Sequence, residues 1–232
     1  MMPNLRIVLL SLAAAALTGL PVQADFVTIS QPDPAYLAGT TLVDFDSSDF
    51  TLIGASSAKG VTLVYDNLLE IRTVADSWTS WGAPPAVETA KPRVGFTDGA
   101  SSLTIALSHR ANTFGFEIEP DQSAAEQTSA SFFSGSTLVG TIELSPSGDS
   151  GALLFAASSA ANPFTAVVIT NLAGGDFAIA RQRVTLVNAV PEPGTWALMV
   201  LALMICGGWQ RYSRRSGTEC AASARRVLPG PM

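Results

Sequence analysis

The chain has 232 residues and a formal net charge of −6, and it contains one histidine and two cysteines. Residues 25–190 hold 17 Asp and Glu against 7 Lys and Arg, an acidic excess that would repel nucleic acid and anionic lipid. Both cysteines, Cys206 and Cys220, lie beyond those residues, which excludes a disulfide or a Cys-containing zinc site within them. We therefore predict no cofactor, no nucleic-acid partner, and stability that comes from an apolar core alone.

Residues 1–24 have the pattern of a secretory signal peptide. Arg6 provides a positive start, and an apolar stretch follows over residues 7–17. The small residue Ala24 directly precedes Asp25, as a signal-peptidase site requires, so we expect cleavage between Ala24 and Asp25. The alternative is an uncleaved N-terminal anchor, for which the apolar stretch is short.

Alternating hydrophobicity predicts β-strands across the middle of the chain. In residues 102–108, Leu103, Ile105 and Leu107 fall on one face and small polar residues on the other. No helical period of useful length occurs between residues 25 and 190, and turn residues separate the runs. The pattern predicts an all-β ectodomain over 25–188, an antiparallel β-sandwich of jelly-roll type. The other expected strands lie near 41–46, 50–54, 60–66, 68–74, 114–119, 128–133, 138–144, 151–156, 164–170 and 176–187.

Two glutamates stand opposite an apolar face in one of these strands. Phe114, Phe116 and Ile118 share the face expected to enter the core, and Glu117 and Glu119 point the other way. A carboxylate pair of this kind could serve a glycosidase. Neighbours at i and i+2 normally form only a solvated face, which is the interpretation we favour from sequence.

Residues 75–92 lack strand alternation and predict a long loop that carries two tryptophans. Trp78 and Trp81 could form a flat platform on which a sugar ring stacks. Alternatively, the two indoles lie on the sandwich and close an open end of its core.

The search for catalytic and metal-binding groups is negative. His109 follows the Leu107 face, which suggests a position at the rim of the core. The string from Gly148 to Gly151 matches the surroundings of a serine-protease nucleophile over four residues, but its context predicts a turn. Asp44, Asp46 and Asp49 could contribute oxygens to calcium, but they lack the EF-hand pattern. We predict no catalytic residue, no metal ligand and no enzyme activity.

The C-terminal part predicts a short membrane anchor. A helix over about 195–212 is just long enough for a thin bilayer. Trp196 and Trp209 stand where interfacial aromatic residues belong, and a basic cluster follows on the cytoplasmic side. The basic residues of this anchor are Arg211, Arg214 and Arg215.

An extended motif precedes the anchor, because Pro191 and Pro193 block helix formation around Glu192. The motif, the apolar span and the basic end occur in the order of a PEP-CTERM sorting signal. The chain resembles the exported proteins that carry this signal, which occur in Gram-negative bacteria that make exopolysaccharide. The resemblance implies recognition of Pro191, Glu192 and Pro193 by an exosortase, a membrane protease-transpeptidase. It also implies an inner-membrane-anchored precursor that later reaches the cell envelope or the extracellular surface.

The sequence thus divides into a signal peptide (1–24), an ectodomain (25–188), a sorting signal (189–215) and a disordered basic cytoplasmic tail (216–232). Three functions remain open for the ectodomain. The first is a non-enzymatic surface or matrix protein. The second is a carbohydrate-binding module, with exopolysaccharide as a candidate ligand. The third is a hydrolase.

Overall fold

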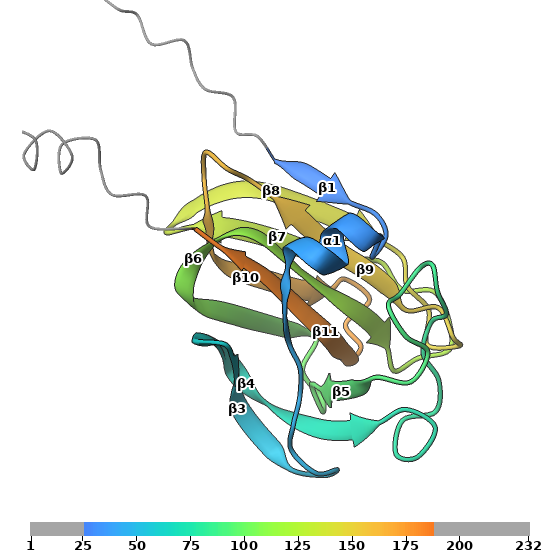
Figure 1. The fold of residues 1–232 in the computed structure, drawn as a ribbon. Helices are drawn as coiled ribbons and strands as arrows, with labels where there is room; N and C mark the ends of the chain where they lie inside the picture. The colour runs from blue at the N-terminus through green and yellow to red at the C-terminus, as the bar shows by residue number, and fades with distance from the viewer. Residues whose placement is uncertain (1–25, 188–232) are drawn as a thin grey trace, which may run out of the picture. The chain divides into compact units, whose positions relative to one another are not determined.

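The computed structural model describes residues 26–187, which form eleven strands and one short helix (Figure 1). The expected signal peptide, sorting motif, membrane helix and C-terminal tail lie outside these residues. Within the described part, no helix is long and apolar enough to cross a membrane. The elements are β1 (Val27–Ile29), α1 (Pro34–Gly39), β2 (Thr41–Val43), β3 (Leu52–Ala58), β4 (Val61–Thr73), β5 (Arg93–Phe96), β6 (Ser102–Pro120), β7 (Thr128–Ser134), β8 (Thr137–Leu144), β9 (Leu153–Ser158), β10 (Phe164–Asn171) and β11 (Phe177–Leu186).

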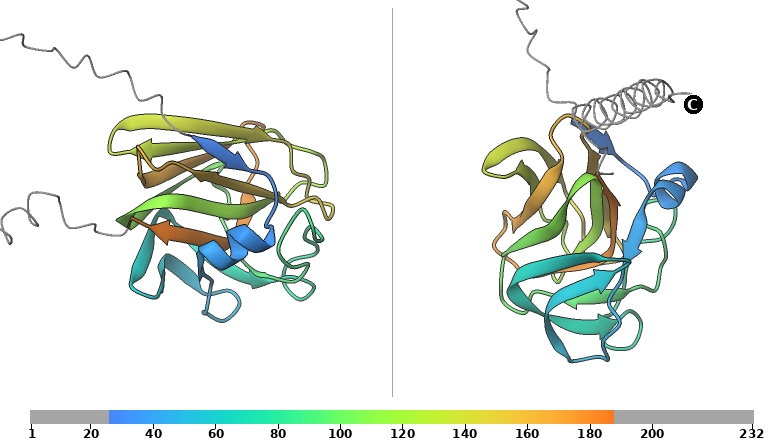
Figure 2. Two further views of the ribbon diagram at one scale, coloured as in Figure 1. Left: turned by 45° about the horizontal axis from the view of Figure 1, so that its top comes forward. Right: turned by 60° about the vertical axis from the view of Figure 1, so that its left-hand side comes forward.

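Two long strands, β4 and β6, change partners midway and so join two layers of antiparallel strands. The first half of β6 pairs with β10 and β4, and its second half pairs with β11 and β9. A back layer therefore runs β3–β4–β6–β10–β7–β8. A front layer contains β5, β11, β9 and β1 with the second halves of β4 and β6. Figure 2 shows the curved β3–β4 hairpin at one side of the molecule.

The core lies between the layers and confirms the predicted all-β sandwich. Phe114, Phe116 and Ile118 of β6 enter it from the front layer, as the alternation predicts, and Leu103 and Ile105 enter it from the back layer. All five side chains are fully buried. Apolar side chains from both layers thus exclude water without any disulfide among the described residues.

Several details differ from the sequence expectations. Strands β1 and β5 were not expected, and the runs at 60–66 and 68–74 form the single strand β4. The runs at 102–108 and 114–119 form one strand of 19 residues. A regular alternation over the expected strand 138–144 would turn Leu138 to the same face as Ile142, but Leu138 is 54% exposed, because a bulge in the pairing of β7 with β8 shifts the alternation there. Helix α1 was not expected, since six residues are too few to show a helical period.

Local capping explains helix α1. Asp33 accepts a hydrogen bond from the backbone N–H of Tyr36 at 2.8 Å, and Pro34 stands at the first helical position. Tyr36 then packs against Leu154 and Ala156 of β9 on the outside of the front layer. The helix therefore covers part of that layer's outer face, as Figure 1 shows.

Ile105→Ala should lower the free energy of unfolding by about 2–5 kcal/mol, because its side chain is fully buried and would leave a cavity. Val64→Ala, at a position that is 48% exposed on the neighbouring strand β4, should cost much less. Urea denaturation of both variants measures the difference. Equal small losses would show that the core face of β6 is misassigned.

Candidate functional site

The outer face of the front layer is covered by residues 74–92, which we call the covering loop. The loop connects β4 to β5 and lies at the right of Figure 1. Its apolar residues Val74, Trp78, Trp81 and Val87 pack on that face. Beneath them are small or flat side chains from β5 and β11, namely Val94, Phe96, Ala178 and Ala180. Small residues on β11 let the loop approach the strands closely.

This cover corrects the expectation that Glu117 and Glu119 form a solvated face. Their exposed fractions are only 1% and 0%. Strand alternation does place both glutamates opposite the core, as predicted. Alternation cannot tell whether a second layer of chain covers that opposite face, and here the covering loop does so.

The covering loop supplies hydrogen-bond donors to both carboxylates. Trp81 donates its Nε1–H to Glu117 Oε2 at 2.9 Å, and the backbone N–H of Glu88 donates to Glu117 Oε1 at 2.5 Å. Ser80 donates its hydroxyl to Glu119 Oε1 at 2.9 Å. Among the described residues, the buried Glu119 Oε2 has no hydrogen-bond partner. Consecutive loop residues, Ser80 and Trp81, thus hold the two glutamates of β6.

Burial raises the pKa of both carboxyls to about 7. For Glu117, the hydrogen bonds from Glu88 and Trp81 and the charge of Arg181 lower the pKa, but burial outweighs them. For Glu119, the hydroxyl of Ser80 and the backbone N–H of Ser150 lower the pKa but offset burial only in part, and the negative charge of Asp149 adds to the increase. Near neutral pH, each carboxyl is therefore divided between its protonated and ionised forms.

The structure buries both tryptophans, which corrects the interpretation of Trp78 and Trp81 as an exposed sugar platform. Trp78 is 6% exposed and Trp81 is 3% exposed. The ring of Trp78 lies 5.3 Å from that of Phe96, centroid to centroid. In this conformation the indoles close an apolar cluster, as the alternative interpretation holds, and present no open face for stacking.

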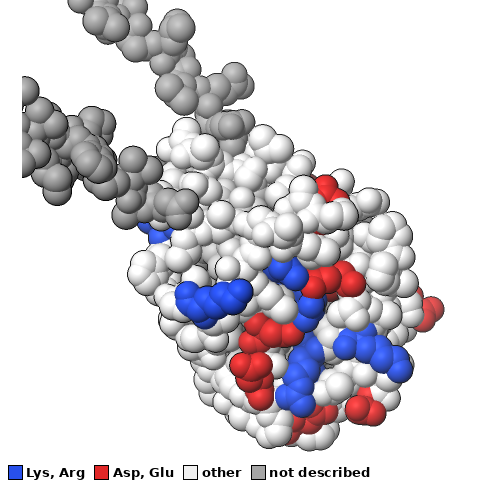
Figure 3. All heavy atoms as spheres, in the orientation of Figure 1, with Lys and Arg blue, Asp and Glu red and all other residues white. Residues whose placement is uncertain are grey.

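A second set of charges anchors the other end of the loop. The carboxylate of Glu88 accepts hydrogen bonds from Arg181 and from Arg183, the latter at 2.7 Å. Burial alone would raise the pKa of Glu88, but the hydrogen bonds from the two arginines hold it below its ordinary value. Arg181 also pairs with Asp44 at 2.7 Å. On the face shown in Figure 3, acidic and basic side chains lie side by side and not in patches of one sign.

The aspartates considered for calcium are engaged elsewhere. Asp44 pairs with Arg181, and Asp49 accepts hydrogen bonds from Thr73 and Ser77. Asp46 is exposed. In the described part of the chain, no group of three or more acidic, His or Cys residues could hold a metal ion.

The remaining catalytic candidates do not form a triad-like arrangement. His109 is exposed and not at the rim of the core, and its Nδ1 lies 2.9 Å from the hydroxyl of the adjacent Ser108. The segment from Gly148 to Gly151 closes a turn, as predicted, with a backbone hydrogen bond from Ser147 N to Gly151 O. Ser150 donates its backbone N–H to the hydroxyl of Ser80.

A polar pocket of about 190 Å³ opens beside the covering loop. Arg72, Trp78, Asp121, Ser123 and Asp149 line it together with loop hydroxyls. The guanidinium of Arg72 lies over the rings of Phe96 and Trp78, 4.3 and 5.9 Å from their centroids. A cation, two carboxylates, several hydroxyls and the side chain of Trp78 therefore line a space that fits a small polar ligand.

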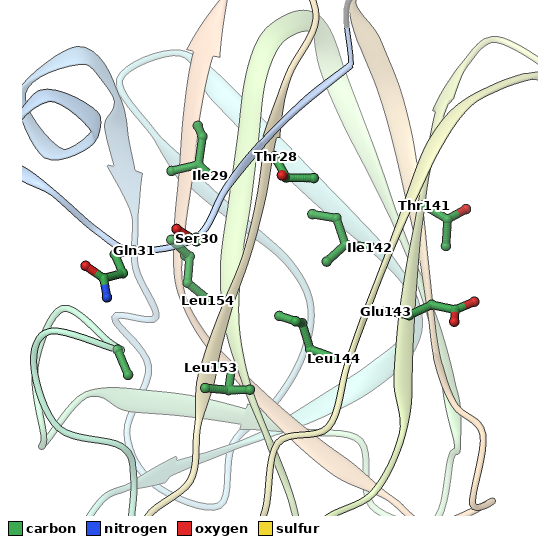
Figure 4. Close-up of a pocket in the computed structure, with 11 residues that line it drawn as sticks. Thr28, Ile29, Ser30, Gln31, Thr141, Ile142, Glu143, Leu144, Leu153 and Leu154 are labelled. Atoms are coloured by element: carbon green, nitrogen blue, oxygen red, sulfur yellow. The ribbon is translucent and has the colours of Figure 1, made fainter.

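A larger opening of about 450 Å³ lies between β1, β8 and β9. Ile142, Leu144 and Leu153 line it, and Figure 4 shows Glu143 directed away from it. Thr141 and Glu143 of β8 are exposed. The opening is an apolar gap at the edge of the sandwich core and contains no catalytic constellation.

Several residues of this region carry no local sequence signal. Ser80, Glu88 and Arg183 are brought to Glu117 and Glu119 by the path of the covering loop and by the pairing of β11 with β6. One signal in the sequence does indicate a buried charged group, because Arg181 and Arg183 stand in a strand that is otherwise mostly apolar. A charge in such a strand requires a partner, although the sequence does not say which.

No protein-family model and no curated protein matches the chain. Among solved structures, it is similar to TmCBM61 in complex with β-1,4-galactotriose, with a TM-score of 0.38 and 11% identity over 62% of this chain and 94% of that one. A family 11 carbohydrate-binding module from Clostridium thermocellum, in complex with a β-1,3-1,4-mixed-linked tetrasaccharide, gives 0.31 and 12% over 63% and 95%. A family 29 carbohydrate-binding module gives 0.26 and 10% over 70% and 89%. With TM-scores this low, the likeness carries no argument about function.

Trp81→Ala should lower the free energy of unfolding by about 3–5 kcal/mol, since the indole is buried against the front layer. Leu138→Ala, at a position that is 54% exposed, is the control and should have little effect. Thermal denaturation of both variants decides the matter. An unchanged melting temperature for Trp81→Ala would favour an exposed platform over the buried arrangement.

Proposed function

We propose that the chain is an exported, non-enzymatic surface protein with a jelly-roll-like ectodomain, sorted through its C-terminal signal. The observation that carries this proposal is the order of three features in the sequence. Pro191, Glu192 and Pro193 precede an apolar span over about 195–212, and the arginine cluster follows. An envelope protein of this kind needs an ectodomain that is stable by itself. The described residues support this requirement, because they enclose their own core.

The proposal includes a route. Signal peptidase removes residues 1–24, and the short span then holds the precursor in the inner membrane. The two prolines keep Glu192 in an extended backbone at the outer edge of that span, where a membrane-embedded exosortase can reach it. After processing, the ectodomain becomes part of the cell envelope or the extracellular surface.

Pro191→Ala combined with Pro193→Ala should leave the full-length form in the membrane fraction, because the membrane helix can then extend through Glu192. The measurement is fractionation and immunoblotting in a host that carries an exosortase, with the same host lacking that enzyme as the control. Neutral replacement of Arg211, Arg214 and Arg215 should instead weaken topology and retention. Processing of the double proline variant at the parental rate would refute the sorting proposal.

We infer a second candidate function, carbohydrate binding, from the polar pocket beside the covering loop. Its carboxylates can accept hydrogen bonds from sugar hydroxyls, its guanidinium can donate to them, and Trp78 adds an apolar contact. The volume of about 190 Å³ accommodates roughly one sugar ring. An exopolysaccharide would be a fitting ligand for a protein at the cell surface.

Asp121→Asn combined with Asp149→Asn should weaken glycan binding by about tenfold or more, because two charged acceptors of the pocket are lost. Asp46→Asn, on an exposed residue outside the pocket, should leave binding unchanged. The assay is a glycan array probed with the detergent-solubilised full chain, followed by titration of any glycan that binds. Failure of the parent protein to bind any glycan would count against this function.

A further inference from the structure

We propose that the covering loop is a pH-operated cover, which Glu117 and Glu119 hold closed over the front layer when protonated and loosen when ionised. The inference concerns the loop alone and does not require that the chain bind carbohydrate. It follows first from where the two carboxyls lie. Both are enclosed between β6 and the loop, and both accept hydrogen bonds from one turn of the loop, Glu117 from Trp81 and Glu119 from Ser80. Glu117 also accepts the backbone N–H of Glu88.

Neither carboxylate forms an ion pair among the described residues, and the only cation that stabilises an ionised form is Arg181, which acts on Glu117 from beyond ion-pair distance. The ion pairs formed among the described residues involve other acids, chiefly Glu88 and Asp44. Charged groups do face the site. Glu88 and Arg181 act on Glu117, and Asp149 acts on Glu119. The hydroxyl of Tyr36, from α1, also lies within electrostatic reach of Glu117.

Ionisation of Glu119 is especially unfavourable in the closed arrangement. Its Oε1 receives the hydroxyl of Ser80, but that hydroxyl also lies 3.0 Å from the carbonyl oxygen of Gly148. Its buried Oε2 receives no donor from the described residues. A buried anion without a cation and with an incomplete set of donors is costly, and opening the loop to water relieves that cost.

The direction of the pH dependence follows from proton linkage. Burial raises both pKa values from 4.5 to about 7, so the closed form binds more protons than an open form with ordinary values. The advantage of the closed form is complete below about pH 4.5 and is lost as the pH rises through about 7. Across that window, the ratio of closed to open loop falls by up to about tenfold per pH unit for each carboxyl.

The opposite end of the loop should stay in place. Glu88 has a pKa below its ordinary value, so its carboxylate remains ionised and paired with Arg181 and Arg183 throughout the same window. The movement is therefore confined to the turn that carries Ser77 to Gly82. Release of this turn would bring the indoles of Trp78 and Trp81 into contact with water.

Hydrogen exchange with mass spectrometry on the full chain tests the cover directly. Between about pH 5 and 7, and after correction for intrinsic exchange rates, protection of peptides covering residues 76–83 should fall by up to about tenfold per pH unit for each carboxyl, and it should level off above about pH 7. Peptides from β10 should keep their protection. A loop whose protection does not change with pH would overturn the proposal, and so would a parallel loss of protection in β10, which would indicate global unfolding.

Three variants assign the effect to the carboxyls. Glu119→Gln, which resembles the protonated side chain, should halve the slope of log protection against pH, and Glu117→Gln added to it should abolish the slope. Glu143→Gln, on an exposed glutamate of β8, is the matched control and should behave as the parent. If the double variant does not fold, Glu119→Gln alone decides. A parental slope in Glu119→Gln would overturn the role of Glu119.

Discussion

The burial of two carboxyls on the outer face of β6 constrains the rest of the front layer. Phe116 and Ile118 must enter the core, and the pleat of the strand therefore turns Glu117 and Glu119 to the opposite side. Carboxyls on an open face would need no partner. Once the covering loop lies over them, the loop must provide donors, and it does so through Trp81, Ser80 and the backbone of Glu88.

Small residues make this cover possible. A side chain at Gly115 of β6 would place its Cβ 2.4 Å from Ala156 and from the hydroxyl of Tyr36, so only glycine lets α1 approach the strands there. At Gly82 in the loop, a Cβ would lie 2.7 Å from the carbonyl oxygen of Ala152. The outer face is thus shaped by close backbone approach as well as by charge, and a larger residue at either glycine would separate the cover from the sheet.

Much of the fold could be predicted because strand alternation is a local property. The faces of β6, β10 and β11 that enter the core can be predicted from the alternation of consecutive residues. The turn at Gly148 to Gly151 can be predicted from its composition. The site could not be read in the same way. Glu117 is identified as outward-facing by its neighbours, but its burial depends on Trp81, 36 residues away in sequence. Likewise, the pairing of Glu88 with Arg181 and Arg183 joins residues more than 90 positions apart.

The two ends of the covering loop respond in opposite directions to a change in pH. At the Glu88 end, the ionised carboxylate is stabilised by two guanidinium groups, so loss of its charge at low pH would weaken the contact. At the Trp81 end, burial disfavours the ionised carboxyls more than their hydrogen bonds favour them, so gain of charge at higher pH weakens the contact. A loop built only on ion pairs would close as the pH rises, and one built only on buried neutral acids would open. Because this loop combines both, one end can loosen while the other remains attached, which allows it to move as a hinged cover and return to the same position.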